Sequence, residues 1–313
     1  MGLGGLLIEL CLCVYVFGCL CLCVLLDFFT FLILLTMGLQ TGVITLKGSV
    51  GNLRFYKVKG QKGSFASTKG GASKSQIMTS PSLARTRENM SEFGGVALVG
   101  KAIRNPLLET KRAWDKGVTG RLVTALKKIN LLDVTSQRGQ RAVQITQFPL
   151  PLLGFEFNQM SHFGVNFRSP YTLSIDTGRT GATLKTQVID ANSTVLNTGG
   201  ATHFRLGLAI EAITDYFYNP TEKKYVPSSG GAAVNGLSAI AWTDYQDVTN
   251  TALPGLTLHA TLPQVGTPPA APTMTPDVSL IVSVVVELFQ QVSGKYYLLE
   301  TGYSMRIDQI ATH

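Results

Sequence analysis

The pattern of apolar and polar residues changes twice along this chain of 313 residues. Residues 3–36 are almost wholly apolar, and residues 37–141 mix basic and small residues with short apolar runs. From residue 143 onward apolar and polar residues alternate. Alternation with a period of two is typical of β-strands, whereas apolar residues three or four positions apart are typical of helices. The pattern therefore predicts three regions, residues 1–36, 37–141 and 142–313.

The middle region is predicted to begin with short strands and to continue as helices. Residues 41–70 contain apolar runs separated by glycine-rich turns, which indicates a small β-hairpin or meander. On its second strand a period of two places Arg54 and Tyr56 on one face. Ser73 and Gln76 have the spacing of a helix capping box. Two helices are expected next, over residues 80–105 and 106–131, and the first would place Leu83, Met90, Phe93, Val96 and Ala97 near one buried stripe.

The third region reads as a series of short strands between Gly, Pro, Asn and Asp residues. Segments such as HFGVNFR, YTLSID and THFRLGLAIEAI predict an antiparallel β-sandwich of jelly-roll or immunoglobulin-like type. In the longest strand, residues 279–292, every second side chain is an apolar core candidate, and Ser293 with Gly294 predicts a two-residue hairpin turn. The fold class predicted for the chain is therefore α+β.

The first region contains all five cysteines, in the stretch CLCVYVFGCLCLC at residues 11–23. About 20 apolar residues are enough to span a bilayer, and the basic residues from Lys47 onward would hold the following chain in the cytoplasm. The C-x-C spacing inside an apolar run is unlike a zinc site. The other interpretation is that translation begins at Met37, which leaves a cytoplasmic protein without this tract. A membrane contact is expected only if residues 1–36 are translated.

The charge is divided unevenly between the second and third regions. Residues 37–141 carry 19 Lys and Arg and 5 Asp and Glu, a net charge of +14. Residues 142–313 carry 8 and 12 of these, a net charge of −4. Such asymmetry predicts that the basic region meets something acidic. The expected partner is a second copy or another protein, and nucleic acid is the alternative.

We therefore expect a non-enzymatic structural or assembly protein whose basic region contacts an acidic surface. The alternative is a nucleic-acid-binding protein that uses the same basic face. The residues predicted to contact the partner are Arg54, Tyr56, Arg85, Arg87, Lys101, Arg104, Lys111, Arg112, Lys127 and Lys128.

Few residues point to catalysis. Residues 37–313 contain no cysteine, no H-E-x-x-H motif and no G-x-S-x-G motif, which are patterns of metal-dependent and nucleophilic enzymes. Gly95 to Ala102 matches part of a phosphate-binding loop, but Ala102 stands where Ser or Thr would hold magnesium. We expect no enzyme activity, no cofactor and no metal.

One pair of carboxylates is a weak candidate for a site. Glu287 and Glu300 are equally far from the predicted turn, so an unbroken hairpin would place them opposite each other. Opposed carboxylates destabilise a sheet unless they bind a cation or share a proton. A β-bulge that shifts the register is the interpretation we favour over a site.

Three stretches carry a resemblance: TGVITLKGSVGNLRFYKVKG, KGGASKSQIMTSPSLARTRENMSEFGG and ELFQQVSGKYYLLETG. They resemble a group of conserved hypothetical proteins of Bacteroidota-type bacteria, over nearly all of residues 37–313. Proteins of that group begin near the position of Met37, so the resemblance implies a start there. It implies no activity, because the group has no established function.

Overall fold

The computed structural model describes residues 37–41, 45–196 and 199–313, and it divides the chain into two compact units between Thr79 and Ser80. Residues 1–36 lie outside the described part, and with them the predictions made for the cysteine-rich tract. Within the described part no helix combines the length and apolar character needed to cross a membrane.

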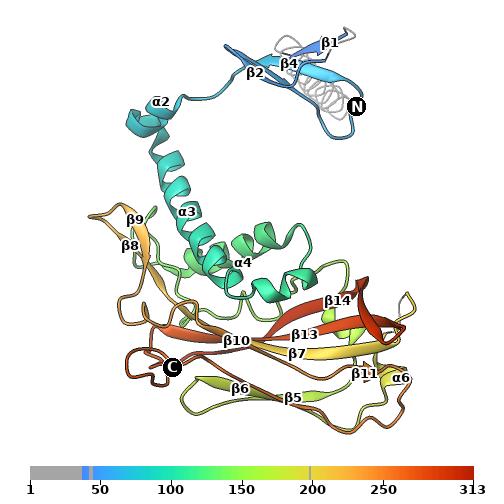
Figure 1. The fold of residues 1–313 in the computed structure, drawn as a ribbon. Coiled ribbons are helices and arrows are strands. Elements are labelled where there is room, and N and C mark those ends of the chain that lie inside the picture. Colours follow the sequence, from blue (N-terminus) through green and yellow to red (C-terminus); the bar gives the residue numbers. More distant parts are fainter. Residues whose placement is uncertain (1–36, 42–44, 197–198) are drawn as a thin grey trace, which may run out of the picture. The chain divides into compact units, whose positions relative to one another are not determined.

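The N-terminal unit is an antiparallel sheet followed by a short helix (Figure 1). The strand order is β1-β4-β3-β2. Its elements are β1 (Met37–Gln40), β2 (Gly48–Val50), β3 (Leu53–Tyr56), β4 (Ser64–Thr68) and α2 (Lys74–Thr79). The predicted capping box is confirmed, because the backbone N–H of Gln76 donates to Ser73 Oγ at 3.2 Å and that of Ser73 donates to Gln76 Oε1 at 2.7 Å.

The larger unit begins with helices. They are η1 (Pro81–Leu83), α3 (Ala84–Arg104), η2 (Leu108–Ala113), α4 (Val118–Leu132), and the four-residue α5 (Phe163–Asn166) and α6 (Ala191–Thr194). The prediction of one helix over residues 106–131 is wrong, because Trp114 has an extended backbone and Asp115 Oδ1 accepts a 2.6 Å hydrogen bond from the N–H of Gly117. The segment HFGVNFR, expected as a strand, contains α5.

The remainder of the larger unit is made of antiparallel strands. They are β5 (Tyr171–Ile175), β6 (Gly181–Thr186), β7 (His203–Thr214), β8 (Tyr216–Asn219), β9 (Lys224–Pro227), β10 (Ser238–Trp242), β11 (Gln246–Asp247), β12 (Thr257–Thr261), β13 (Val278–Val292) and β14 (Lys295–Ala311). The central sheet has the order β10-β7-β13-β14, with β11 also pairing with β7. A smaller sheet has the order β12-β6-β5, and β8 pairs with β9. The chain is thus α+β, as predicted.

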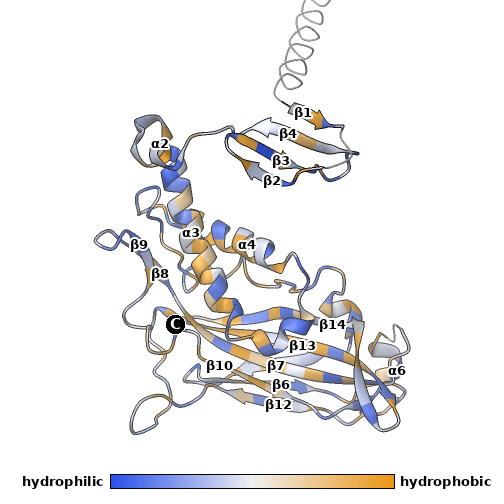
Figure 2. Cartoon of the chain, turned by 45° about the horizontal axis from the view of Figure 1, so that its top comes forward, coloured by the Kyte–Doolittle hydropathy of each residue, from blue (hydrophilic) through white to orange (hydrophobic). Residues whose placement is uncertain are grey.

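Buried apolar side chains lie on both faces of the central sheet, and hydrophobic residues recur along β7 and β13 in Figure 2. On one face the even-numbered residues of β7, such as Leu208, share a buried cluster with Leu184 of β6 and Leu258 of β12. On the other face Ala209 and Ile281 belong to a cluster with α3 and α4. The two helices, which we grouped with residues 37–141, therefore pack on the β-rich part and belong to its unit.

The buried face of α3 includes Val96 of the predicted stripe but not Met90 or Phe93. Met90 and Phe93 are 54% and 60% exposed, whereas Val96 and Val99 are fully buried. Both faces of this helix carry apolar residues, so periodicity alone does not select the buried side. Gly95 to Ala102, the partial phosphate-loop spelling, lies inside α3, where a Cβ at Gly95 would come within 2.4 Å of the Tyr225 ring.

Candidate functional site

The N-terminal sheet carries cations without carboxylates. Between Met37 and Thr79 the chain has seven Lys and Arg and no Asp or Glu. Within residues 37–79 a cation therefore has no carboxylate of the same segment with which to pair. The sheet is also open to solvent on both faces, since Ser64 is its only buried residue among those described.

The two faces of this sheet differ in chemistry. Arg54 on β3 is opposite Ser67 on β4 and Ser49 on β2, and Tyr56 on β3 is opposite Phe65 on β4. Alternate residues of a strand and the residues opposite them share one face of a sheet, so these side chains lie together. This face is here called the basic face. Val50 and Leu53, which are opposite each other, lie on the other face, here called the apolar face. Val50 is 65% exposed and Leu53 is 43% exposed. The unit therefore presents a basic side and an uncovered apolar side.

Two adjoining hollows lie on the N-terminal unit. The first, of about 440 Å³, is lined by Arg54, Tyr56, Lys57, Ser67, Thr68, Lys69 and Gly70. The second, of about 600 Å³, is lined by Ser49, Asn52, Arg54, Lys69, Gly70, Gly71, Ala72, Ser73 and Gln76. Arg54, Lys69 and Gly70 line both hollows. Arg54 and Tyr56, which we predicted to contact a partner, are thus brought to the same place.

The strand pairing explains why distant residues meet there. The backbone N–H of Lys69, just after β4, donates to Asn52 O at 2.8 Å, and Lys69 Nζ donates to Gly51 O at 2.9 Å. These two bonds place the ammonium beside the β2–β3 turn. The guanidinium of Arg54 and the ammonium groups of Lys57 and Lys69 are donors suited to carboxylate or phosphate oxygens. Tyr56 adds an aromatic face, with its ring 6.2 Å from that of Phe65.

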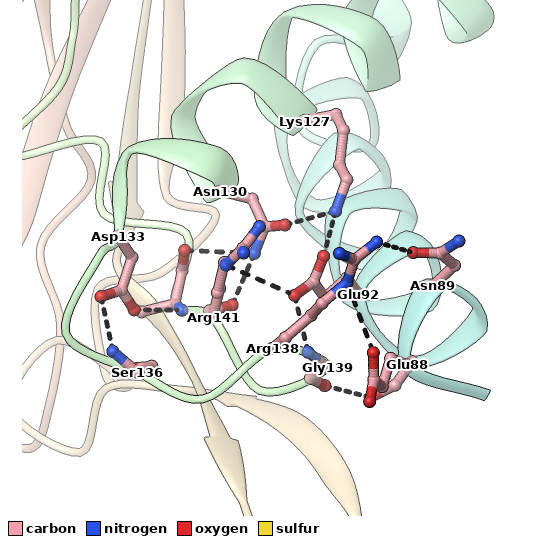
Figure 3. Close-up of polar contacts among 12 residues, drawn as sticks. Glu88, Asn89, Glu92, Lys127, Asn130, Asp133, Ser136, Arg138, Gly139 and Arg141 are labelled. Carbon is pink, nitrogen blue, oxygen red and sulfur yellow. Dashed lines mark hydrogen bonds and ion pairs between the residues drawn. The ribbon is translucent and has the colours of Figure 1, made fainter. Parts of the chain in front are cut away.

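Lys127, one of the predicted contact residues, is held by its own unit (Figure 3). It pairs with the buried carboxylate of Glu92 on α3, and its Nζ donates to Asn130 Oδ1 at 2.6 Å. The N–H of Gly139 donates to Glu92 Oε1 at 2.7 Å. Burial alone would raise the pKa of Glu92, but the bonds from Lys127 and Gly139 and the charge of Arg141 outweigh it and the pKa lies below its usual value. Lys127 thus joins α4 to α3.

Other predicted contact residues of the helices also have partners within the chain. Arg85 Nη1 lies 3.7 Å from Glu88 Oε2, and Arg87 donates to Ser80 O at 2.7 Å. Arg104 donates to Gly100 O at 3.1 Å. Lys101, Lys111, Arg112 and Lys128 are exposed on the larger unit. Of the predicted contact residues, two thus lie in the N-terminal unit and eight in the larger unit, where several have partners within the chain.

The β13–β14 hairpin separates the two carboxylates that an unbroken register would oppose. The predicted turn is confirmed, since Ser293 and Gly294 both have positive φ. The pairing shifts between Glu287 and Phe289, and Glu287 is opposite Tyr303. Direct opposition of Glu287 and Glu300 is therefore wrong, and the bulge interpretation is confirmed.

Glu287 is buried in an ion pair. Both Arg205 Nε and Nη2 lie 2.7 Å from Glu287 Oε2, and the Glu287 side chain is 1% exposed. The Arg205 guanidinium also lies over the Trp242 ring, 4.1 Å from its centroid. This arrangement is a structural contact within the sheet. Among the described residues no three His, Cys, Asp or Glu side chains gather closely enough to hold a metal.

Lys57 and Lys69 were missed when the sequence was read alone. Strand alternation identified Arg54 and Tyr56, but Lys69 reaches the hollows only through the β3–β4 pairing. The signal that points to them is the run of residues 28–87, which has no Asp or Glu.

Comparison of the chain with protein-family models, with curated proteins and with solved structures finds no match. The resemblance to a bacterial group therefore stays a prediction, and function has to be argued from the geometry.

Proposed function

We propose that this protein is a non-enzymatic interaction protein whose N-terminal sheet contacts an acidic surface of a protein partner, either a second copy or another chain. The single observation that carries the proposal is the composition of this sheet, which has seven cations and no carboxylate between Met37 and Thr79 and is exposed on both faces. A surface of this kind gains most from a partner that supplies the missing negative charge.

The apolar face supports a protein partner. A sheet is stabilised in water when one face is covered, and the exposed Val50 and Leu53 form no buried core within the described part of the unit. A partner that covers the apolar face would remove these side chains from water, at about 25 cal/mol for each Å² buried. Binding to an acidic protein would therefore use both faces, the basic one for charge and the apolar one for burial.

Nucleic acid is a second candidate for the partner, and the first hollow favours it. Arg54, Lys57 and Lys69 surround Tyr56 there, and single strands bind where cations follow the backbone and an aromatic ring stacks on a base. If the three cations neutralise three phosphates of a single strand, the slope of log K for binding against log salt concentration should be about −2.

The test compares two triple variants of the full chain. Arg54→Glu, Lys57→Glu and Lys69→Glu reverse charge in the hollows, and Lys101→Glu, Lys111→Glu and Arg112→Glu make the same change on the larger unit. Light-scattering mass and the 260/280 nm absorbance ratio are measured in moderate salt. We expect the first variant to lose the complex and the second to keep it. Equal behaviour of the two variants contradicts the proposal, and a complex that contains nucleic acid moves the second candidate to first place.

For the β-rich part we propose a β-sandwich. The support is the buried cluster shared by β7 and β13 of the central sheet with β6 and β12 of the smaller sheet, which is the arrangement of two facing sheets. An experimental structure that shows the β12-β6-β5 sheet packed elsewhere would contradict this, and the same structure would decide between jelly-roll and immunoglobulin-like connections.

A further inference from the structure

A groove of about 620 Å³ lies in the larger unit, between α4 and the segment of residues 151–162. This volume is in the range of small-molecule sites, about 300–1,000 Å³. The groove belongs to the unit that begins at Ser80, so it is independent of the N-terminal sheet and of the function proposed for it.

Arg121 fixes the two walls of the groove. Its guanidinium donates a 2.8 Å hydrogen bond to Asp115 Oδ1. It also donates to the carbonyl oxygens of Glu156 and Phe157 on the facing segment, each at 3.2 Å. Asp115 Oδ2 in turn accepts a 2.9 Å hydrogen bond from the N–H of Gln159. These bonds join α4 to the facing segment, so the groove is formed before any ligand arrives.

Glycine keeps the groove open. A Cβ at Gly120, inside α4, would meet nothing within 4 Å, whereas Gly154, on the facing segment, is a glycine because its φ is +74°. Glycine weakens a helix relative to alanine, and at Gly120 no close packing requires it. A side chain at this position would occupy the groove without striking the protein.

The polar lining suits an anion. Lys128 presents an exposed ammonium, and His162 an exposed imidazole, while the charge of Arg121 is already balanced by Asp115. Burial raises the pKa of the one lining carboxyl, Glu156, and the hydrogen bond from the N–H of Phe163 only partly offsets this. Glu156 Oε1 lies 4.0 Å from His162 Nδ1, which places this carboxyl beside the imidazole.

The lining also includes apolar residues. Phe155 and Pro151 lie on one wall and Ala125 on the other. Sites for small molecules combine such apolar walls with a few polar groups that orient the ligand. The groove thus offers a surface for an apolar body and, beside it, donors for a charged end.

We propose that this groove is a binding site for a small organic oxyanion, a molecule with an apolar body and a carboxylate or phosphate group. The oxyanion pairs with Lys128 and accepts a hydrogen bond from His162, and the apolar body packs on Phe155. Carboxylate and phosphate share this chemistry, so the two are distinguished by experiment.

The experiment titrates the full chain with phenyl phosphate, benzoate and the neutral benzyl alcohol, followed by calorimetry or ligand-observed NMR. We expect one or both anions to bind at least about tenfold more tightly than the alcohol, since charge-assisted hydrogen bonds are the strong ones. The tighter of the two anions identifies the head group. Binding of both anions no tighter than the alcohol overturns the proposal.

Two pairs of variants locate the site. Gly120→Leu fills the groove and should abolish binding, whereas Gly94→Leu, at an open position inside α3 and outside the groove, should leave binding unchanged. Lys128→Ala should weaken anion binding about tenfold, and Lys116→Ala, an exposed lysine that does not line the groove, should not weaken it. Thermal unfolding of all four variants confirms that they are folded. Anion binding that survives both Gly120→Leu and Lys128→Ala places the site elsewhere and refutes the proposal.

Discussion

Glu211 is a carboxyl buried among apolar side chains, and replacing it with glutamine should stabilise the protein at neutral pH. It lies on β7 opposite Ile281 of β13, on the sheet face that packs against α3 and α4. Neither of its oxygens has a hydrogen-bond partner among the described residues, and the hydroxyls of Ser279 and Ser283 beside it have none either. Burial therefore raises the pKa of Glu211 well above its usual value.

The direction and size of this change in stability depend on the pH at which Glu211 releases its proton in the folded and in the unfolded chain. Below about pH 4.5 Glu211 is protonated in the folded and the unfolded chain, so it does not change stability with pH. Above that pH the unfolded chain releases the proton and the folded chain keeps it. Each pH unit then lowers the free energy of unfolding by about 1.4 kcal/mol, until the folded pKa is reached.

Glutamine keeps the shape of the neutral acid and has no proton to lose. Glu211→Gln should thus match the parent near pH 4.5 and exceed it increasingly as the pH rises, by about 1.4 kcal/mol for each pH unit until the folded pKa is reached. Urea unfolding of both proteins at pH 4.5, 5.5, 6.5 and 7.5 measures the difference, and Glu222→Gln, at an exposed residue paired with Lys224, is the control with an expected change near zero. A difference between Glu211→Gln and the parent that does not grow with pH refutes the reasoning.

Two further variants test buried charges in the larger unit. Glu287→Ala leaves Arg205 without its partner and should lower the free energy of unfolding by about 3 kcal/mol in urea. Glu92→Gln should cost about 2 kcal/mol at pH 7, because Glu92 accepts bonds from Lys127 and Gly139. The pKa of Glu92 is lowered in the fold, so its stabilisation is present above about pH 4.5 and is lost as the pH falls through the folded pKa, and the cost should shrink below pH 4 in the same assay.

Features with a local cause could be predicted from the sequence. The capping box at Ser73 depends on three residues, and the turn at Ser293 and Gly294 depends on two. The core face of β13 follows from simple alternation, and Leu280, Val284 and Leu288 on it are fully buried. In each case the residues that specify the feature are also neighbours in the chain.

Features decided by distant packing could not be predicted. Met90 and Val96 are both apolar residues of α3, and only the position of the central sheet and α4 determines that Val96 is the buried one. The bulge in the β13–β14 hairpin was expected from the opposed carboxylates, but the new register that pairs Glu287 with Tyr303 has no local signal. This register is fixed by β7, where Arg205 lies directly opposite Glu287 and supplies the countercharge.

The distribution of charges along the chain explains which of the predicted contact residues are paired with carboxylates of the same chain. Where the chain mixes cations with carboxylates, folding pairs them, as Lys127 pairs with Glu92 and Arg85 with Glu88. Where the chain has no carboxylate, as between Met37 and Thr79, folding of that segment cannot neutralise its own cations. The order of charges along the sequence thus identifies available cations better than their number does, and it directs the search for a partner to Arg54 and its neighbours.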